Sequence, residues 1–304
     1  MLELKIYSEC IPCQAQIRFR DIQRVVFNED ERISLITKLL DLIVKEINEK
    51  GRNTSPAHLG TKLFRFIKMI TGVDDPCEEM KRIEYINGLK LYNTICSELK
   101  KLDINKRIVK SIKLALIGNA LDLDVAGYVP PNTNQILNEV ETIIVRGTSI
   151  ESIIDVIKNA RIITFVLDNT GEAALDKLLS ESLRDLGIYT IAIVKSGAFQ
   201  NDITIKEAKY LELSNSFDEV VETGTDAASI FLDELAPKAK RVIDESDILI
   251  SKGMANFEYI SEIEKIINKP IIYMLKTKCR PVTMELRVDI GDYVINVTNI
   301  KHPQ

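Results

Sequence analysis

Hydrophobic residues recur at helical spacing through the first third of the chain, from about Cys10 to Asn119. Between residues 33 and 47 they stand three or four positions apart with charges on the opposite faces, which is typical of an amphipathic helix. The pattern breaks at Ser55-Pro56 and again near Pro76, and a serine cap followed by proline favours a helix start. This third of the chain therefore predicts a group of helices.

After Pro130 and Pro131 the pattern changes to short runs rich in Ile and Val, separated by helix-length amphipathic segments. The runs cover residues 141–147, 161–169, 187–196, 218–224, 247–253, 269–277 and 292–297. Such alternation indicates βαβ units and a mainly parallel sheet with helices on both faces. We therefore expect a doubly wound α/β domain that binds metal and phosphate over residues 129–304, preceded by an all-helical domain over residues 1–128.

Polar side chains follow four consecutive predicted strands where each strand ends, which is where open parallel sheets bind their ligands. The run 161–169 ends in Asp168 and Asn169, and the run 187–196 carries Lys195 near its end and is followed by Asn201 and Asp202. The run 218–224 ends in Gly224 and is followed by Thr225 and Asp226, and the run 247–253 ends in Lys252 and Gly253 and is followed by Asn256 and Glu258. One carboxylate in this position is often only the cap of the next helix. Four successive sets favour a binding site.

The residue types in these sets narrow the chemistry. Asp168, Asn169 and Asp202 are oxygen donors, the ligands of a cation such as Mg²⁺ or Mn²⁺. Lys195 and Lys252, together with helix N-termini, would attract an anion such as phosphate, although either lysine could instead be a surface charge or part of an ion pair.

The helical part supplies one further pair of candidates, Asn119 and Asp122. They are three residues apart and share a helix face if the helix continues through them. The alternative is a polar helix end, where Asp122 would oppose the helix dipole.

Composition and charge exclude several classes of function. With 40 basic and 45 acidic residues the chain carries a net charge of −5, so it offers no general basic surface to nucleic acid. No stretch approaches the roughly 20 apolar residues of a membrane span, and the first residues lack a signal-peptide pattern. Only two histidines are present, which disfavours histidine-based zinc or triad chemistry. We expect a cytoplasmic protein, and the oligomeric state stays open.

Several segments together resemble the archaeal-type branch of the damage-control phosphatase family, metal-dependent phosphatases once classed as a domain of unknown function. These segments are LDNTGE at 167–172, GAFQNDIT at 197–204, GNALD at 118–122 and SKGMANFE at 251–258, with CIPC at 10–13, DDPCEEMK at 74–81, ETGTDA at 222–227 and TKCRPVTMEL at 277–286. The resemblance covers most of the chain. It implies hydrolysis of phosphate esters of small metabolites, such as sugar phosphates or damaged intermediates, with Mn, Co, Ni or Mg as cofactor.

The resemblance also implies roles for individual residues. Asp168, Asn169 and Asp202 would hold the metal, and Asn119, Asp122, Glu172 and Lys252 would line the same site as catalytic residues. We expect Lys195, Gly224, Thr225 and Lys252 to bind the substrate phosphate. One departure is Cys77, which stands where the family pattern has an aromatic residue at the pocket entrance.

Alternatives to this interpretation stay open. Asp168 could be a covalent nucleophile as in haloacid-dehalogenase phosphatases, but that motif carries a second Asp where this chain has Thr170. A protein carboxyl methyltransferase would need a glycine-rich loop after its first strand, where this chain has only Gly147. A non-catalytic metabolite-binding protein is the third class. The CIPC cysteines could be structural, a redox pair or metal ligands.

Overall fold

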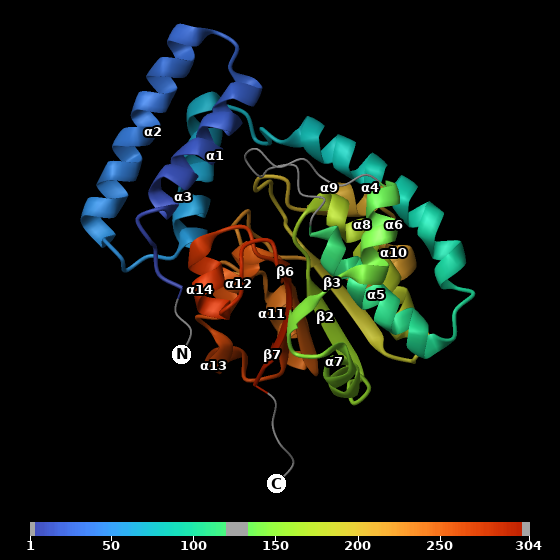
Figure 1. Cartoon of the computed structure of the whole chain (residues 1–304). Helices are drawn as coiled ribbons and strands as arrows, with labels where there is room; N and C mark the ends of the chain where they lie inside the picture. Colours follow the sequence, from blue (N-terminus) through green and yellow to red (C-terminus); the bar gives the residue numbers. More distant parts are fainter. Residues whose placement is uncertain (1–3, 120–132, 300–304) are drawn as a thin grey trace.

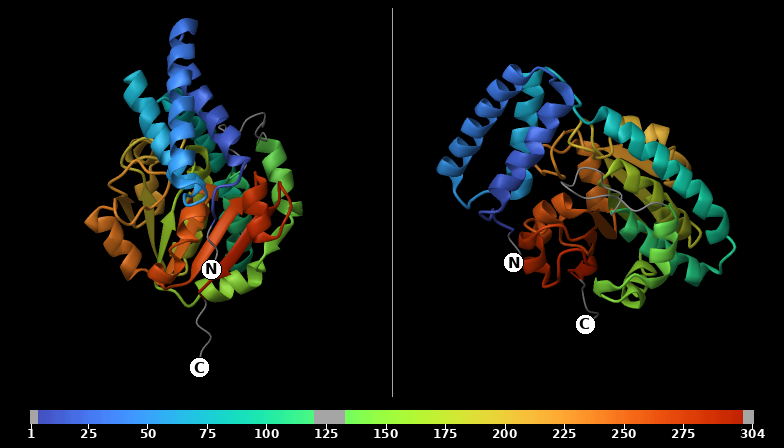
Figure 2. Two further views of the ribbon diagram at one scale, coloured as in Figure 1. Left: turned by 90° about the vertical axis from the view of Figure 1, so that its left-hand side faces the viewer. Right: turned by 45° about the horizontal axis from the view of Figure 1, so that its top comes forward.

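The computed structural model describes residues 4–119 and 133–299, and its first three helices pack together around a core of their own. They are α1 (Cys10–Val25), α2 (Glu29–Lys50) and α3 (Pro56–Thr71). The core contains Ile22, Leu39 and Leu63. As the sequence predicts, α3 begins at the proline of Ser55-Pro56, and the Ser55 hydroxyl accepts a hydrogen bond from the His58 amide. Figure 2 shows these helices standing beside the larger body of the molecule.

The next two helices, α4 (Glu78–Leu99) and α5 (Ile104–Gly118), pack instead on the sheet domain. Both lie against α8 (Thr170–Arg184), and their buried residues Leu91 and Ile112 share one core with Phe165 of the sheet. The predicted helical third therefore contains two groups of helices with different neighbours. The predicted domain boundary near residue 128 lies outside the described residues.

The remainder is a seven-stranded sheet in the order β1-β7-β6-β5-β2-β3-β4. The strands are β1 (Val145–Gly147), β2 (Ile162–Val166), β3 (Tyr189–Val194), β4 (Glu219–Glu222), β5 (Ile248–Lys252), β6 (Ile271–Lys276) and β7 (Tyr293–Thr298). All neighbouring strands run parallel except β6 and β7. The mainly parallel sheet predicted from the alternating pattern is confirmed.

Helices cover both faces of this sheet (Figure 1). They include α6 (Thr133–Thr142), α7 (Ile150–Ile157), α9 (Ile205–Tyr210), α10 (Leu213–Ser216), α11 (Pro237–Glu245), α12 (Met254–Ile260), α13 (Glu264–Ile267) and α14 (Arg280–Leu286). Phe165 and Leu178 belong to the core on one face, whereas Leu249, Val242 and Phe257 belong to the core on the other. The doubly wound architecture is therefore confirmed. Within the described ranges no helix is long and apolar enough to cross a membrane.

Strand β2 occupies the position that decides where a ligand can bind. It lies between β5 and β3, and the chain continues from β3 to β4 on one side and from β5 to β6 on the other. In doubly wound sheets this change of direction opens a crevice at the carboxyl ends of the strands. The three strand ends at this point deliver Asp168, Lys195 and Lys252.

Candidate functional site

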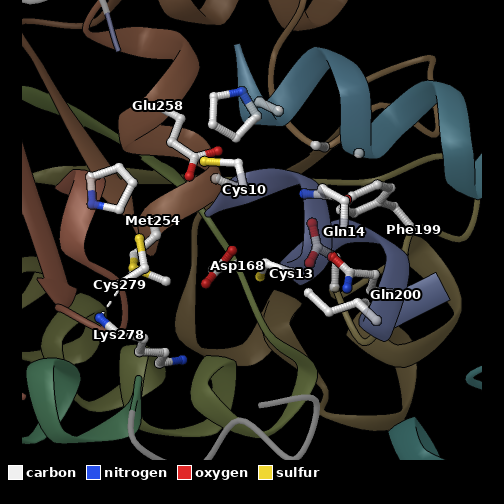
Figure 3. Close-up of a pocket in the computed structure, with 18 of the residues that line it drawn as sticks. Cys10, Cys13, Gln14, Asp168, Phe199, Gln200, Met254, Glu258, Lys278 and Cys279 are labelled. Atoms are coloured by element: carbon white, nitrogen blue, oxygen red, sulfur yellow. Dashed lines mark hydrogen bonds between the residues drawn. The ribbon is translucent and has the colours of Figure 1, made fainter. Parts of the chain in front are cut away.

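A cavity of about 340 Å³ lies at the carboxyl edge of the sheet and is walled on one side by α1 and the start of α3 (Figure 3). A volume of this size fits a small metabolite. The strand ends contribute Asp168, Asn169, Asn201 and Asp202, and the other walls include Cys10, Cys13, Gln14, Gln200, Met254, Glu258, Lys278 and Cys279. The structure thus brings the three predicted metal ligands to one cavity wall.

The Asn169 side chain is oriented by two carboxylates. Its Nδ2 donates to Asp168 Oδ2 at 3.1 Å and to Glu172 Oε2 at 3.4 Å. Because ionised carboxylates only accept hydrogen bonds, the amide nitrogen must face them. The amide oxygen then faces another direction and can serve as a cation ligand.

Asp202 reaches this wall because the loop after β3 folds back onto the end of β2. Asn169 and Asp202 form an isolated antiparallel bridge, and the Ile203 amide donates to the Asp168 carbonyl at 2.9 Å. Glu84 of α4 anchors the same loop by accepting from Asn201 Nδ2 at 2.8 Å. Backbone contacts and the buried Glu84 side chain therefore fix the spacing of Asp168 and Asp202.

Asn119, directly after α5, touches the same carboxylates. Its Nδ2 donates to Asp168 Oδ2 at 3.2 Å and to Glu172 Oε2 at 2.8 Å, while its Oδ1 accepts from the Lys276 amide at 3.0 Å. Both ends of this buried amide are engaged within the protein, so its geometry is that of a residue that positions Asp168. Asp122 lies outside the described residues.

Lys252 is fully buried and does not line the cavity. Its Nζ lies 2.6 Å from Glu172 Oε1 and 2.8 Å from Asp176 Oδ1, and it donates to the Ala115 carbonyl. Burial lowers the pKa of Lys252, but the two carboxylates outweigh burial and hold it above its ordinary value. Lys252 therefore holds Glu172, and Glu172 in turn accepts from the amides that orient Asp168.

Sequence reasoning missed Asp176. This carboxylate is one helical turn beyond Glu172 on α8 and is fully buried, and burial raises its pKa to about 7. The available signal was two carboxylates four residues apart on a helix that is otherwise apolar on that side.

Gly253, directly after Lys252, allows β5 to pass close to the site. Its φ is +76°, and a Cβ there would lie 1.8 Å from Asp168 Oδ2. Any side chain at this position would displace the carboxylate.

The four predicted phosphate-binding residues occupy three different environments. Lys195 is buried with its Nζ 3.5 Å from Asp202 Oδ2, and burial lowers its pKa while Asp202 and Asp168 oppose the shift. Gly224 and Thr225 do not line the cavity: the Gly224 amide donates to Ser196 Oγ at 2.6 Å, while Thr225 Oγ1 donates to Glu234 and accepts from Arg65 of α3. Lys252 is held beneath the cavity as described above.

The charges around the cavity suit a bound cation. Among the described residues, the acidic side chains of Glu9, Asp168, Asp202 and Glu258 line it, and Lys278 supplies a basic one. In the part of the chain that the structure describes, no three His, Cys, Asp or Glu side chains are grouped to hold a metal ion. The candidate set is two carboxylates and one amide, which fits Mg²⁺, because Mg²⁺ is usually bound by one or two carboxylates together with water and substrate phosphates.

The CIPC motif is also part of this cavity. Cys10 and Cys13 lie in the first turn of α1, and Cys279, which directly precedes α14, lines the same cavity (Figure 3). These thiols are free, and burial raises the pKa of Cys10 to about 11 and that of Cys279 to about 12. They are therefore neutral thiols at neutral pH.

Comparison with known proteins defines the class. The sequence model of the "Damage-control phosphatase ARMT1-like domain" matches residues 6–294, so the chain belongs to this family, and the resemblance seen in the sequence is confirmed. It is 30% identical over 295 residues to a damage-control phosphatase of Pyrococcus horikoshii, covering 96% of this chain and 97% of the relative. It is 25% identical over 304 residues to a damage-control phosphatase of Archaeoglobus fulgidus, covering 97% and 99% of the two chains.

Two further similarities span nearly the full length. An uncharacterized protein of Methanocaldococcus jannaschii is 27% identical over 300 residues, covering 96% of this chain and 95% of that protein. The crystal structure of a DUF89 family protein from Pyrococcus horikoshii superimposes with a TM-score of 0.81 at 27% identity, covering 96% of this chain and 98% of that one. The fold described above is therefore that of the family, and the family supports a phosphatase role.

Proposed function

We propose that this protein is a metal-dependent phosphatase that hydrolyses phosphomonoesters of small metabolites. The observation that carries the proposal is the meeting of Asp168, Asn169 and Asp202 on one wall of a metabolite-sized cavity, at the point where the sheet changes direction. The names of the curated relatives support the same reaction class.

A divalent cation held by Asp168, Asn169 and Asp202 would polarise the phosphoryl group and lower the pKa of a bound water. The residues around it have separate tasks. Asn119 and Asn169 both donate to Asp168 Oδ2 and so fix the carboxylate before any ligand arrives. Preorganised ligands of this kind cost no reorganisation during the reaction.

Two lysines support the site in different ways. Lys195 does not line the cavity, but its buried ammonium lies beside Asp202, which does, and we propose that its charge attracts the phosphoryl oxygens of the substrate through this wall. Lys252 is a positioning residue in this scheme, because its partners are Glu172, Asp176 and a carbonyl oxygen. The N-terminus of α8 begins directly after Asn169 and adds the positive end of a helix dipole.

The arrangement favours Asp168 as a metal ligand over Asp168 as a nucleophile. Two amides bind one oxygen of its carboxylate. The residue two positions later is Thr170, whose hydroxyl donates to the Asn201 carbonyl, so no second aspartate stands there to protonate a leaving group.

The test is release of phosphate from p-nitrophenyl phosphate before and after removal of metal with a chelator. We expect no release without a divalent cation and restoration by Mn²⁺, Co²⁺, Ni²⁺ or Mg²⁺. A parallel assay follows methyl transfer from S-adenosylmethionine to protein carboxyl groups. Methyl transfer without phosphate release would contradict the proposal and favour the methyltransferase class.

A further inference from the structure

Three segments outside the proposed phosphatase chemistry meet at one part of the cavity. Glu258 comes from α12, Cys10 and Cys13 come from α1, and Cys279 precedes α14 (Figure 3). These four side chains line the part of the cavity next to the wall that carries Asp168, Asn169 and Asp202. A site built from three distant segments suits recognition of the part of a substrate that does not react.

Glu258 shares the cavity with Glu9 and Lys278, but within the described ranges it forms no ion pair. Glu258 interacts electrostatically with the titratable groups of Cys10, Cys13, Cys279 and Glu262. All of these groups are neutral or acidic. Among the described residues no lysine or arginine forms an ion pair with Glu258. Burial and, second, Glu262 raise its pKa to about 8, so ionising it near neutral pH costs little if a positive partner arrives.

Glu258 and Asp168 line the same cavity of about 340 Å³ (Figure 3). Gly253 lies against the Asp168 carboxylate, and Glu258 follows it on α12. A substrate whose phosphoryl group lies near Asp168 can therefore extend within this cavity toward Glu258. A butyl phosphate is a small probe that suits a cavity of this volume.

We propose that Glu258 determines substrate specificity by binding a primary ammonium group on the alcohol portion of the phosphate ester. The preferred substrates are then phosphomonoesters of amino alcohols. This inference rests on the proposed phosphatase function, because it assumes that the phosphoryl group is held at Asp168 and Asp202.

The experiment compares 4-aminobutyl phosphate with 4-hydroxybutyl phosphate, which differ only in the terminal group. We expect kcat/KM for the amino ester to exceed that for the hydroxy ester by tenfold or more at pH 8.5. Glu258→Gln should reduce this ratio to within about threefold, as expected on loss of one buried charge pair. Glu262→Gln removes an equal charge outside the cavity and should keep the wild-type ratio.

A pH series on the wild type tests the same claim without any variant. The amine of the probe stays protonated, so the ratio of the two kcat/KM values should rise on the order of tenfold between pH 6.5 and 8.5 as Glu258 ionises. Equal values at all pH, or a preference that survives in Glu258→Gln, would overturn the proposal.

Failure of this inference is distinguishable from failure of the phosphatase function. Hydrolysis of p-nitrophenyl phosphate without preference between the two esters overturns only the role of Glu258. Absence of hydrolysis of all three esters in the metal-loaded protein contradicts the phosphatase function. Calorimetric binding of the two butyl phosphates then still reports whether Glu258 selects the ammonium.

Discussion

Asp168, Glu172 and Lys252 belong to one connected set, in which Asp168 lines the cavity while Glu172 and Lys252 are fully buried behind it. Lys252 fixes Glu172, and Glu172 with Asp168 orients the amides of Asn119 and Asn169. A charge in such an interior is tolerated only when it is paired and hydrogen-bonded. Substitution of the buried Lys252 or Glu172 should therefore mainly lower the stability of the fold. Substitution of the cavity-lining Asp168 should mainly lower metal binding and turnover.

Lys252→Met tests this division. The substitution leaves Glu172 and Asp176 without a counter-ion, so we expect the free energy of unfolding to fall by about 3–5 kcal/mol. Denaturant unfolding of the metal-free protein measures it. Lys206→Met, which removes a half-exposed partner of Glu78, is the control and should cost under about 1 kcal/mol.

The contrary result for Lys252→Met would be an intact stability with turnover lowered by a factor on the order of 10²–10³. That outcome would assign Lys252 to direct contact with the phosphoryl group.

Glu258 gives a pH-dependent stability with a defined sign. Its pKa in the folded protein is about 8, above the unfolded value near 4.5, so its contribution favours folding at low pH and is lost as pH rises through 8. Glu258→Gln should melt at a higher temperature than the wild type at pH 9, with a smaller difference at pH 5. Thermal melts at the two pH values measure this. A constant difference would mean that Glu258 does not change its protonation state between the two pH values.

At the scale of elements, the strands and their polar ends could be predicted from the sequence because each depends on a local pattern. The run 161–169 contains β2 (Ile162–Val166) followed by Asp168 and Asn169. Gly224 and Thr225 follow β4 with the same local appearance, yet neither lines the cavity, and Thr225 accepts a hydrogen bond from Arg65 of α3. Arg65 is 160 residues away from Thr225 in sequence, and no local pattern encodes that contact.

The start of α12 gives a prediction about backbone approach. Gly253→Ala would place a methyl group within 1.8 Å of Asp168 Oδ2, so the carboxylate must move and metal affinity and turnover should fall together, each by at least tenfold. Gly187→Ala is the matched control, because φ is +81° there and no atom lies within 4 Å of the added carbon. Calorimetry with Mn²⁺ and phosphate release measure both. Equal behaviour of the two variants would show that backbone strain alone is responsible.

At the scale of the whole molecule, the cavity exists because α1 and α3 pack against the carboxyl edge of the sheet. The contact is charged: Arg65 pairs with Asp226 and Glu234, and Lys68 pairs with Asp226. The sequence predicted both helices and sheet, but the contribution of α1 to the cavity wall depends on this packing. The sequence therefore identified the CIPC motif but did not predict that its cysteines line the cavity.

Arg65→Ala should loosen this contact. We expect KM for small phosphate esters to rise several-fold with little change in kcat, because α1 and α3 supply cavity walls while Asp168 and Asp202 belong to the sheet. Steady-state kinetics measure the two constants. Arg82→Ala, which breaks an exposed pair with Glu79 on α4, should leave both unchanged. A fall in kcat alone would contradict the assignment of these helices to substrate enclosure.

The most direct test asks whether Asp168 and Asp202 hold a catalytic cation. The wild type, Asp168→Asn and Asp202→Asn are titrated with Mn²⁺. Metal binding is followed by calorimetry, and phosphate release is measured in the same samples. Each variant keeps the side-chain shape and removes one ligand charge. We expect one bound cation in the wild type, and metal affinity and turnover that fall together in both variants. Wild-type turnover in either variant at limiting metal would contradict it.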